Sequence, residues 1–421
     1  MHILDELEWR GLVAHATDLD ALRGELSEGM VKLYCGFDPT APSLHMGNLL
    51  QILTLKRFQD AGHKPYGLVG GATGMIGDPK ETGERQMNSL DTVKQWSANV
   101  RSQLERFLSF EGSNAASVVN NYDWTAGLST IEFLRDVGKH FPVNRMLARE
   151  VVKSRLEVGI SYTEFSYVLL QSMDYLNLYR DFGVRLQTGG SDQWGNITAG
   201  VDLIRRVEGG HVHALATPLV TKADGTKFGK TESGTVWLDA TMTSPYAFYQ
   251  FWLNTDDRDV VDLLKYYTFR SREEIEELAE ATREKPFLRT AQRALADDVT
   301  TLVHGAEETA RIKAASAALF GTGDLTELSV DTLGAALREA GSVQVKRGDG
   351  LPGIVDLLVE TGLVQSKGAA RRTIGEGGAY LNNRRVQDPE LVPAVEDLIG
   401  GSWLVLRRGK KHLAGVEVVG A

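Results

Sequence analysis

Short apolar runs alternate with longer segments of helical spacing along the first part of the chain. Val31–Phe37 is an extended apolar run, and Leu49–Phe58 has apolar residues three and four apart, as in a helix that closes near Gly62. Pro65–Val69 is a second strand-like run, and Thr92–Phe110 has the pattern of a long amphipathic helix. Strand, loop and helix in series predict a parallel α/β sheet, with ligands at the carboxyl ends of its strands.

The middle of the chain continues this alternation after a helical stretch. Residues from about 120 to 179 are predicted to be mostly helical. Val184–Gln187 is a short strand-like run, which a glycine-rich loop and a helix near Ile197–Val207 follow. Leu215–Val220 then precedes the loop Lys222–Thr231. These units repeat the strand–loop–helix order of the first part.

The pattern changes again near residue 244. From there to about Leu319 the chain is rich in Glu, Ala, Arg and Leu at helical spacing, and Gly321–Glu327 has the composition of a linker. From about residue 348 to the end, two short predicted helices precede strand-like runs such as Ser402–Leu406. We therefore expect a separate small α+β module at the C-terminal end.

The composition is that of a soluble globular protein. The chain has 421 residues, which allows two to four domains of ~100–200 residues, and it is 42% apolar and 24% charged. No apolar run approaches the ~18 residues of a membrane span, and Met1–Glu8 has no secretory pattern. The one cysteine, Cys35, excludes an intramolecular disulfide and a cysteine zinc cluster. We expect a cytoplasmic protein without membrane association.

The formal net charge of −10 is unevenly distributed. Taken alone, it argues against a polyanionic partner. Residues 345–421 nevertheless hold eleven basic and nine acidic residues, a net +2, so the rest of the chain carries −12. Because electrostatic fields are local, a basic patch near the C-terminus could still bind nucleic acid.

Residues 34–48 combine a predicted strand, a proline turn and a helix start. His45 and Asn48 lie three residues apart at the helix start, where both can face one ligand. The free N–H groups there attract phosphate, and Gly47 would let a flat base or a ribose approach the backbone. The alternative is a turn in which His45 only caps the helix.

The glycine-rich loop Gly70–Asp78 has the spacing G-x-x-G-x-x-G. It matches neither the dinucleotide fingerprint nor the phosphate loop, so binding of NAD and P-loop hydrolysis are poorly supported. Asp78 could bind an ammonium group, or it could only cap a helix or a turn.

A polar stripe interrupts the apolar helix predicted over residues 165–175. Tyr167, Gln171 and Asp174 are spaced by four and three, so they share one face. A phenol, an amide and a carboxylate in line can recognise a small zwitterion. The alternative is a solvated helix face.

Two further loops carry polar groups suited to a nucleotide. In Leu186–Gly195, Asp192 can accept hydrogen bonds from a ribose and Gln193 can donate to a phosphate. The alternative is a glycine-rich turn in which Ser191 or Asp192 caps the next helix. The lysines of Lys222–Gly234 could close over phosphates, or they could be surface residues of a hairpin. No metal site is indicated, and neither a Gly-x-Ser-x-Gly elbow nor a Cys–His pattern offers a nucleophile.

In this order, the motifs resemble those of a class I aminoacyl-tRNA synthetase. His45–Asn48 is similar to its first signature, with asparagine in place of the usual second histidine, and Lys227–Thr231 is similar to its second, the mobile lysine loop. Asn48 can donate a hydrogen bond but cannot carry a charge. Longer strings resemble bacterial-type tyrosyl-tRNA synthetases almost letter for letter, namely Tyr34–Thr40, Gly70–Asp78, Thr163–Tyr167, Gly189–Ala199 and Thr221–Gly234.

The resemblance implies an ATP-driven reaction in two steps, with Mg²⁺ accompanying the ATP. The tyrosine carboxylate attacks the α-phosphate and releases pyrophosphate, and the tyrosyl group then passes to the terminal ribose of tRNA(Tyr). Positioning and charge neutralisation carry such chemistry, so no protein nucleophile is required.

The resemblance also assigns roles to matching residues. Tyr34 and Asp174 would bind the phenol, and Gln193 would lie near the α-phosphate or the carboxylate. Arg85 is an additional candidate for a phosphate contact. The full sets are Tyr34, Asp78, Tyr167, Gln171, Asp174 and Gln193 for tyrosine; Cys35, Gly36, Asp38, Gly47, Asn48, Asp192 and Lys230 for ATP; and Thr40, His45, Asn48, Lys227, Lys230 and Thr231 for catalysis.

The implied fold is α/β, with a Rossmann-like parallel-sheet catalytic domain over residues 1–235 and a dimerisation insertion near 120–180. An all-helical domain on the anticodon side of tRNA would cover 236–325. Residues 345–421 resemble a small RNA-binding domain first known from a ribosomal protein. Its expected RNA contacts are Lys367, Arg371 and Arg372. The family forms homodimers, and we expect one here.

Two alternative functions stay open at the level of sequence. A tryptophanyl-tRNA synthetase shares the fold and the signatures, but an indole does not call for the pair Tyr34 and Asp174. A catalytically silent RNA-binding paralogue would be expected to lack His45, Asp78 or the lysine loop, and all of these are present.

Overall fold

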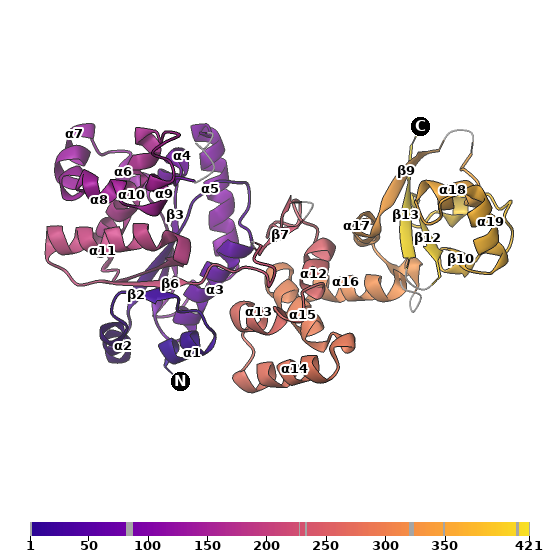
Figure 1. The fold of residues 1–421 in the computed structure, drawn as a ribbon, viewed down its shortest axis with the longest axis horizontal. Coiled ribbons are helices and arrows are strands. Elements are labelled where there is room, and N and C mark those ends of the chain that lie inside the picture. Colours follow the sequence, from indigo (N-terminus) through magenta and orange to yellow (C-terminus); the bar gives the residue numbers. More distant parts are fainter. Residues whose placement is uncertain are drawn as a thin grey trace. The chain divides into compact units, whose positions relative to one another are not determined.

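The computed structural model describes residues 2–80, 87–226, 228–231, 234–319, 324–347, 350–409 and 412–420. The chain divides into two compact units, one formed by Met1–Met242 with Asp256–Arg283 and the other by Thr243–Thr255 with Glu284–Ala421. Figure 1 labels the helices and strands of both units. The chain therefore leaves the first unit, returns to it once, and then leaves it again.

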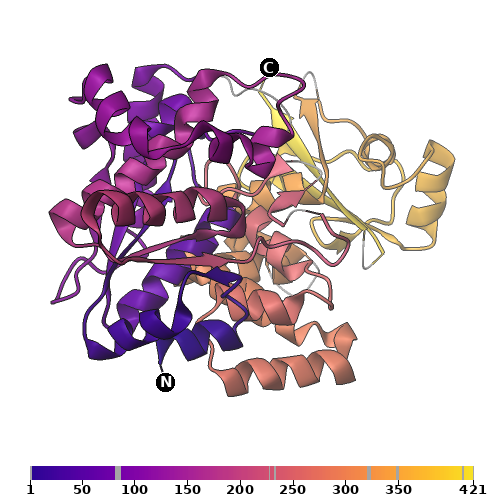
Figure 2. The ribbon, with the colours of Figure 1, turned by 60° about the vertical axis from the view of Figure 1, so that its left-hand side comes forward.

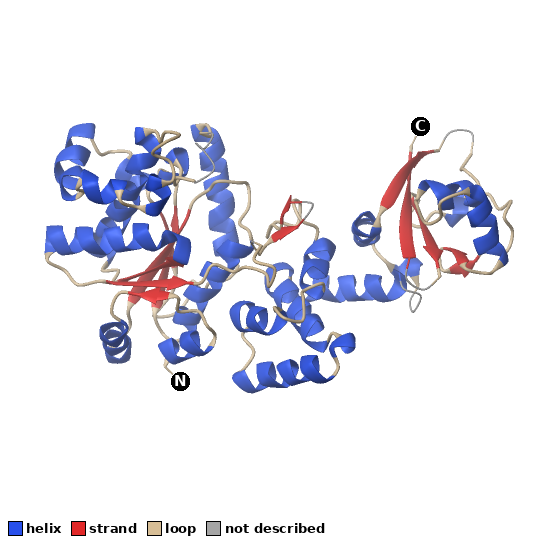
Figure 3. Cartoon of the chain, in the orientation of Figure 1, coloured by secondary structure: helices blue, strands red, loops and turns tan. Residues whose placement is uncertain are grey.

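A six-stranded sheet forms the centre of the first unit (Figure 3). Its strands are β1 (His15–Ala16), β2 (Lys32–Phe37), β3 (Lys64–Val69), β4 (Ser117–Asn120), β5 (Leu186–Gly190) and β6 (His213–Thr217). The order is β1-β6-β5-β2-β3-β4, parallel throughout except for β1 at one edge. This confirms the predicted parallel α/β sheet. In its middle, Tyr34 of β2 pairs with Tyr66 on one side and with Gln187 on the other.

Helices lie on both faces of this sheet (Figure 2). The longer helices of the first unit are α2 (Leu19–Glu28), α3 (Met46–Asp60), α5 (Leu90–Leu104), α10 (Tyr162–Asn177), α11 (Trp194–Glu208), α13 (Val260–Tyr267) and α14 (Arg272–Glu284). The shorter ones are α1 (Ile3–Trp9), α4 (Thr73–Ile76), α6 (Tyr122–Thr125), α7 (Thr130–Glu132), η1 (Phe133–Val137), η2 (Gly138–His140), α8 (Val143–Leu147), α9 (Glu150–Lys153), η3 (Leu178–Phe182) and η4 (Ser191–Gln193). The stretch predicted to be helical from about 120 to 179 is thus a series of short helices before the long α10.

The strand predicted at Val184–Gln187 begins two residues later, for a local reason. Gly183 ends the preceding helical segment in a left-handed conformation with φ of 69°. The N–H of Val184 then bonds to the carbonyl of Leu178 at 3.1 Å, which closes the helix end and keeps Val184 out of the sheet.

Apolar packing between α10, α11 and the strands forms the core of the first unit. Tyr34, Tyr175, Leu178 and Ile204 are fully buried in one cluster. Burial of each such side chain contributes roughly 1.5–3 kcal/mol. The faces of α10 and β2 that bind this core also fix the direction of their polar side chains.

The second unit combines helices with a five-stranded sheet. Its elements are α12 (Pro245–Leu253), η5 (Pro286–Leu288), α15 (Thr290–His304), α16 (Ala306–Leu319), η6 (Leu325–Glu327), α17 (Val330–Ala340), β9 (Ser342–Lys346), α18 (Ile354–Glu360), α19 (Lys367–Gly375), β10 (Ala379–Leu381), β11 (Arg384–Arg385), η7 (Val395–Asp397), β12 (Trp403–Arg408) and β13 (His412–Val419). The strand order is β11-β10-β12-β13-β9. The predicted small α+β module is confirmed, and β9 adds a strand before it that pairs with β13 in parallel.

The short hairpin of β7 (Lys230–Thr231) and β8 (Gly234–Thr235) completes the elements of the first unit. Within the described parts of the chain, no helix is both long enough and apolar enough to cross a bilayer.

Candidate functional site

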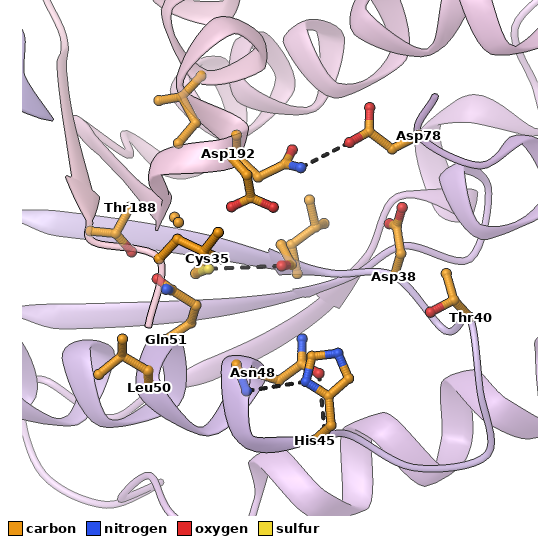
Figure 4. A pocket seen from close by; sticks show the side chains of 18 of the residues that line it. Cys35, Asp38, Thr40, His45, Asn48, Leu50, Gln51, Asp78, Thr188 and Asp192 are labelled. Atoms are coloured by element: carbon orange, nitrogen blue, oxygen red, sulfur yellow. Dashed lines mark hydrogen bonds between the residues drawn. The ribbon is translucent and has the colours of Figure 1, made fainter. Parts of the chain in front are cut away.

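A cavity of about 350 Å³ opens where β2 and β5 end, beside the start of α3 (Figure 4). Its walls come from the carboxyl ends of parallel strands, which is where such sheets bind ligands. The predicted residues that line it are Tyr34, Cys35, Gly36, Asp38, Thr40, His45, Gly47, Asn48, Asp78, Tyr167, Gln171, Asp174, Asp192 and Gln193. Four separate stretches of sequence, 34–48, 78, 167–174 and 192–193, therefore meet in one space.

The floor of the cavity holds a phenol beside a carboxylate. Tyr34 is fully buried, and its ring packs against that of Tyr175 with 5.2 Å between the ring centroids. Burial raises the pKa of Tyr34, and the neighbouring Asp174 raises it further, so the hydroxyl stays protonated. That buried hydroxyl has no hydrogen-bond partner among the described residues. It is thus a donor that a ligand can satisfy.

Asp174 is held by two donors that the sequence did not single out. Nδ2 of Asn121 donates to Oδ2 and Nε1 of Trp124 donates to Oδ1, each at 2.9 Å. Burial raises the pKa of Asp174 to about 7, against the effect of these two bonds. Asn121 directly follows the carboxyl end of β4, and that position was the signal that could have identified it.

A chain of hydrogen bonds joins the polar stripe of α10 to the turn after β2. The hydroxyl of Tyr167 donates to Oδ2 of Asp38 at 2.6 Å, and that of Thr73 donates to Oδ1 at 2.7 Å. Nδ2 of Asn121 donates to the Thr73 hydroxyl at 2.9 Å. Asp38 thereby connects to the carboxylate at the cavity floor through two side chains, those of Thr73 and Asn121.

The glycines of the loop after β3 make room for this network. A Cβ on Gly70 would lie 2.0 Å from Oδ1 of Asp38 and 2.5 Å from the Thr73 hydroxyl. A Cβ on Gly74 would lie 2.8 Å from the ring of Pro39. Gly70 and Gly74 are therefore packing requirements of the turn that follows β2.

Asp78 forms the carboxylate at the opposite wall. It accepts hydrogen bonds from Nε2 of Gln193 at 2.8 Å and from Nδ2 of Asn196 at 3.1 Å. Asn196 also accepts a hydrogen bond from the guanidinium of Arg149. Asp78 is thus held by side chains of the segment that follows β5.

The side chains at the start of α3 cap that helix. Nδ1 of His45 accepts a hydrogen bond from the N–H of Gly47 at 3.1 Å, and Oδ1 of Asn48 accepts one from the N–H of His45, also at 3.1 Å. This capping box is why the helix begins at Met46 and not at the predicted Leu49. Because Nδ1 is an acceptor, a neutral His45 ring carries its proton on Nε2. Both side chains also line the cavity.

Amide side chains that the sequence did not predict, Gln51 and Gln187, line the same cavity. Nε2 of Gln51 donates to the hydroxyl of Thr217 at 2.7 Å, and its Oε1 has no partner among the described residues. Gln51 follows Asn48 by three residues on α3, so helical spacing was a signal for it. Gln187 and Thr188 enter the lining from β5.

The thiol of Cys35 sits in the wall as a neutral group. Burial raises the pKa of Cys35 to about 12, so its sulfur stays protonated and is a poor nucleophile.

Across the described residues, no group of three or more histidine, cysteine or acidic side chains is arranged to hold a metal ion.

The lysine loop reaches the cavity through its central residues. Phe228 and Gly229 line the cavity, and Lys230 and Thr231 form β7. Lys227 and Arg85, both predicted to contact phosphates, lie outside the described residues.

The predicted RNA-binding side chains lie on the second unit, on α19. Lys367 pairs with Asp356 at 2.6 Å and Arg371 pairs with Glu390 at 3.5 Å, while both cations are more than half exposed. Arg372 is exposed on the same helix. Arg407 stacks on Tyr380 of the neighbouring sheet, 4.5 Å from the ring centroid.

Two protein-family models match this chain. Residues 26–321 match the family of class I tRNA synthetases for tryptophan and tyrosine. Residues 335–415 match the C-terminal domain of SYY-like tyrosine–tRNA ligases.

Curated relatives match over the full length. A tyrosine–tRNA ligase of Streptomyces avermitilis is 64% identical over 421 residues, which is 99% of either chain. One of Mycobacterium bovis is 58% identical over the same length and with the same coverage. Among solved structures, a C-terminally truncated mitochondrial tyrosyl-tRNA synthetase of Coccidioides posadasii is 32% identical with a TM-score of 0.66, over 74% of this chain and 91% of that one.

Proposed function

Because this chain belongs to the class I tRNA synthetases of the tryptophan and tyrosine family, and resembles their tyrosyl members over its whole length, we propose that it is a tyrosine–tRNA ligase. It activates L-tyrosine with ATP and transfers the tyrosyl group to tRNA(Tyr). The observation that carries the choice of amino acid is the pair at the cavity floor. A buried phenol without a partner lies beside a buried carboxylate there.

The pair is complementary to a phenol substrate. The substrate hydroxyl donates to Asp174 and accepts from Tyr34, which satisfies both groups. Phenylalanine would leave the buried Tyr34 hydroxyl unpaired, at a cost of roughly 1–3 kcal/mol, and would offer no donor to Asp174 besides those of Asn121 and Trp124. Tryptophan offers only an indole N–H, which cannot accept from Tyr34. These costs favour the tyrosyl function over the tryptophanyl alternative.

We assign the amino group of tyrosine to the part of the cavity that Asp78, Tyr167 and Gln171 line. Asp78 supplies the negative charge, and Tyr167 and Gln171 contribute polar atoms from α10. Gln171 has a buried Oε1 without a partner among the described residues, so an ammonium N–H can bond to it. Gln193, which binds Asp78, lies near the carboxylate or the α-phosphate.

Activation of tyrosine forms one bond and breaks one. A carboxylate oxygen of tyrosine attacks the α-phosphorus, the bond from that phosphorus to the bridging oxygen breaks, and pyrophosphate leaves. Negative charge grows on the leaving group, so donors placed there stabilise the transition state. We assign this task to Thr40, His45, Lys227, Lys230 and Thr231, with Mg²⁺ bound to the ATP.

The adenosine part of ATP fits the side of the cavity next to α3. Asp192 and Asp38 provide acceptors for ribose hydroxyls, and Asn48 provides an amide donor. Gly36 and Gly47 leave space beside the backbone, and the neutral Cys35 thiol completes this wall. Asn48 therefore suffices where a second histidine is usual.

Transfer to tRNA completes the reaction. A hydroxyl of the terminal ribose attacks the tyrosyl carbonyl, and AMP leaves. Residues 1–235 serve as the catalytic domain with a dimerisation insertion near 120–180, 236–325 as the anticodon-side domain, and 345–421 as the RNA-binding domain. We further propose that the protein is a cytoplasmic homodimer and that Lys367, Arg371 and Arg372 contact tRNA.

The decisive experiment is tyrosine-dependent exchange of labelled pyrophosphate into ATP, with tryptophan and phenylalanine as matched controls. Exchange with tyrosine alone is the expected result. Exchange with tryptophan instead would favour the tryptophanyl alternative. A folded protein without any exchange, but with tRNA affinity, would favour the silent RNA-binding paralogue.

A second measurement separates binding from catalysis. Lys230→Ala should slow adenylate formation more than it weakens tyrosine binding, because the lysine acts on charge that develops in the transition state. Equal losses in both quantities would contradict this role.

A further inference from the structure

The side chain of Tyr267 touches both signature motifs. It is fully buried at the end of α13 and lines the cavity. Its hydroxyl donates to the carbonyl of Met46 at 3.2 Å, in the first turn of α3. Its ring lies 5.9 Å from that of Phe228, the aromatic residue of the lysine loop, with 35° between the planes. Tyr267 thus joins two segments that are 182 residues apart in the sequence.

The lysine loop packs directly on α3 at this point. Gly229 has φ of +84°, and a Cβ there would lie 2.9 Å from Cβ of Met46. The N–H of Phe228 bonds to the carbonyl of Val220 at 3.1 Å, and the carbonyl of Gly229 accepts from Val236 at 3.0 Å. The backbone on both sides of the Phe228 ring is therefore fixed, and the ring itself is only 9% exposed.

Two buried arginines hold the end of α13 that carries Tyr267. Arg57 of α3 donates to the carbonyl of Thr268 at 2.6 Å, and Arg10 donates to the carbonyls of Lys265 at 2.9 Å and Arg270 at 2.7 Å. Each arginine is 3% exposed. Guanidinium groups at a helix C-terminus satisfy its free carbonyls and face the negative end of its dipole. These hydrogen bonds link the end of α13, and with it Tyr267, to α3 and to the end of α1.

We propose that Tyr267 is a positioning residue for adenylate formation. Its ring packs against that of Phe228, and its hydroxyl donates to the carbonyl of Met46 in the first turn of α3. It thereby sets the spacing between the helix start with His45 and the segment Phe228–Gly229. In-line transfer at phosphorus is sensitive to displacements of about 1 Å, which can cost ~100-fold in rate. This inference rests on the proposed function, since the reaction that it concerns is the activation of tyrosine.

The test compares Tyr267→Leu with Tyr266→Leu. Tyr266 is a half-buried neighbour on the same helix that does not line the cavity, so the substitution is matched in kind and place. For Tyr267→Leu we expect the turnover of pyrophosphate exchange to fall about tenfold, while the dissociation constant of tyrosine changes less than about twofold. Tyr267→Phe is the conservative variant. It keeps the aromatic ring that packs against Phe228, so it should retain at least about a third of the turnover.

A double-mutant cycle with Phe228→Leu identifies the contact. If the two rings act together, the double variant is no slower than the slower single variant. Effects that add, a turnover for Tyr267→Leu equal to that of Tyr266→Leu, or an equal loss of tyrosine affinity would each overturn the proposal. If Tyr267→Leu does not fold, Phe228→Leu carries the test alone, and an unchanged turnover in that variant would overturn it.

The unsubstituted chain separates this inference from the proposed function. Absence of tyrosine-dependent exchange in the folded wild-type protein would refute the proposed function. Exchange in the wild-type protein together with unaffected Tyr267 variants would refute only the role of Tyr267.

Discussion

The indole Nε1 of Trp124 donates a hydrogen bond of 2.9 Å to Oδ1 of Asp174. Trp124 lies on α6, in the part of the chain between β4 and α10, and Asp174 lies near the end of α10. The bond favours the ionised carboxylate, while burial favours the neutral acid and raises the pKa of Asp174 to about 7. A residue outside the cavity lining therefore opposes the effect of burial on the charge of Asp174.

Substitution of Trp124 by phenylalanine tests this relationship. The change keeps an aromatic ring and removes one donor, so we expect the pKa of Asp174 to rise further and tyrosine affinity near pH 7.5 to fall about 3- to 10-fold. Equilibrium dialysis with labelled tyrosine measures the affinity. Trp9→Phe, on α1, is the control and should bind tyrosine normally. Unchanged affinity in Trp124→Phe would show that the bond has no effect on the carboxylate.

The raised pKa of Asp174 also predicts a pH dependence of stability. The folded-state pKa of about 7 lies above the ordinary value near 3.9, so between these values the folded chain binds more protons than the unfolded chain. The wild-type free energy of unfolding should fall as pH rises through this window, by at most about 4 kcal/mol, and this loss should be complete above pH 7.

The variant Asp174→Asn cannot titrate at this position and should lack that loss. Its free energy of unfolding relative to the wild type, measured in urea at several values between pH 4 and 8, is expected to increase with pH and then level off. A difference that stays constant over the whole range would mean that Asp174 titrates at its ordinary value.

Gly70→Ala should damage the site more than the fold. The new methyl group would lie 2.0 Å from Oδ1 of Asp38, so the carboxylate that accepts from Tyr167 must move. We expect pyrophosphate exchange to fall at least about tenfold because the network loses its geometry. Gly24→Ala on α2, where nothing lies within 4 Å, should keep full activity and gain about 0.5–1 kcal/mol in stability. Similar activity in both variants would contradict the packing argument.

A pair of substitutions on α19 tests the tRNA contact separately from the chemistry of activation. The double variant Arg371→Gln with Arg372→Gln should bind tRNA more weakly and reduce the slope of log K against log salt by about 1–2, because two phosphate contacts are lost. Pyrophosphate exchange, which needs no tRNA, should be unchanged. Arg23→Gln, at a half-buried arginine paired with Asp5 and Glu8 in the first unit, is the control. A binding curve and salt slope equal to those of the wild type would exclude α19 as the contact.

The sequence by itself determined the elements and most of the cavity. Apolar spacing predicted β2, β3 and the parallel order, because a sheet buried on both faces needs continuous apolar strands. Helical spacing placed Tyr167, Gln171 and Asp174 on one face, and the structure shows all three in the cavity wall. Such features depend on residues only a few positions apart, so the spacing of apolar and polar residues predicts them.

Only the tertiary structure decided which polar groups meet across the sheet. Asn121 and Trp124 bind Asp174 from about 50 residues away, and Tyr267 reaches Met46 from 221 residues away. The burial that raises the pKa of Asp174 also arises only when the helix and strands close around it. No periodic pattern in the sequence predicts contacts between residues so far apart, because the packing of whole helices and strands determines them.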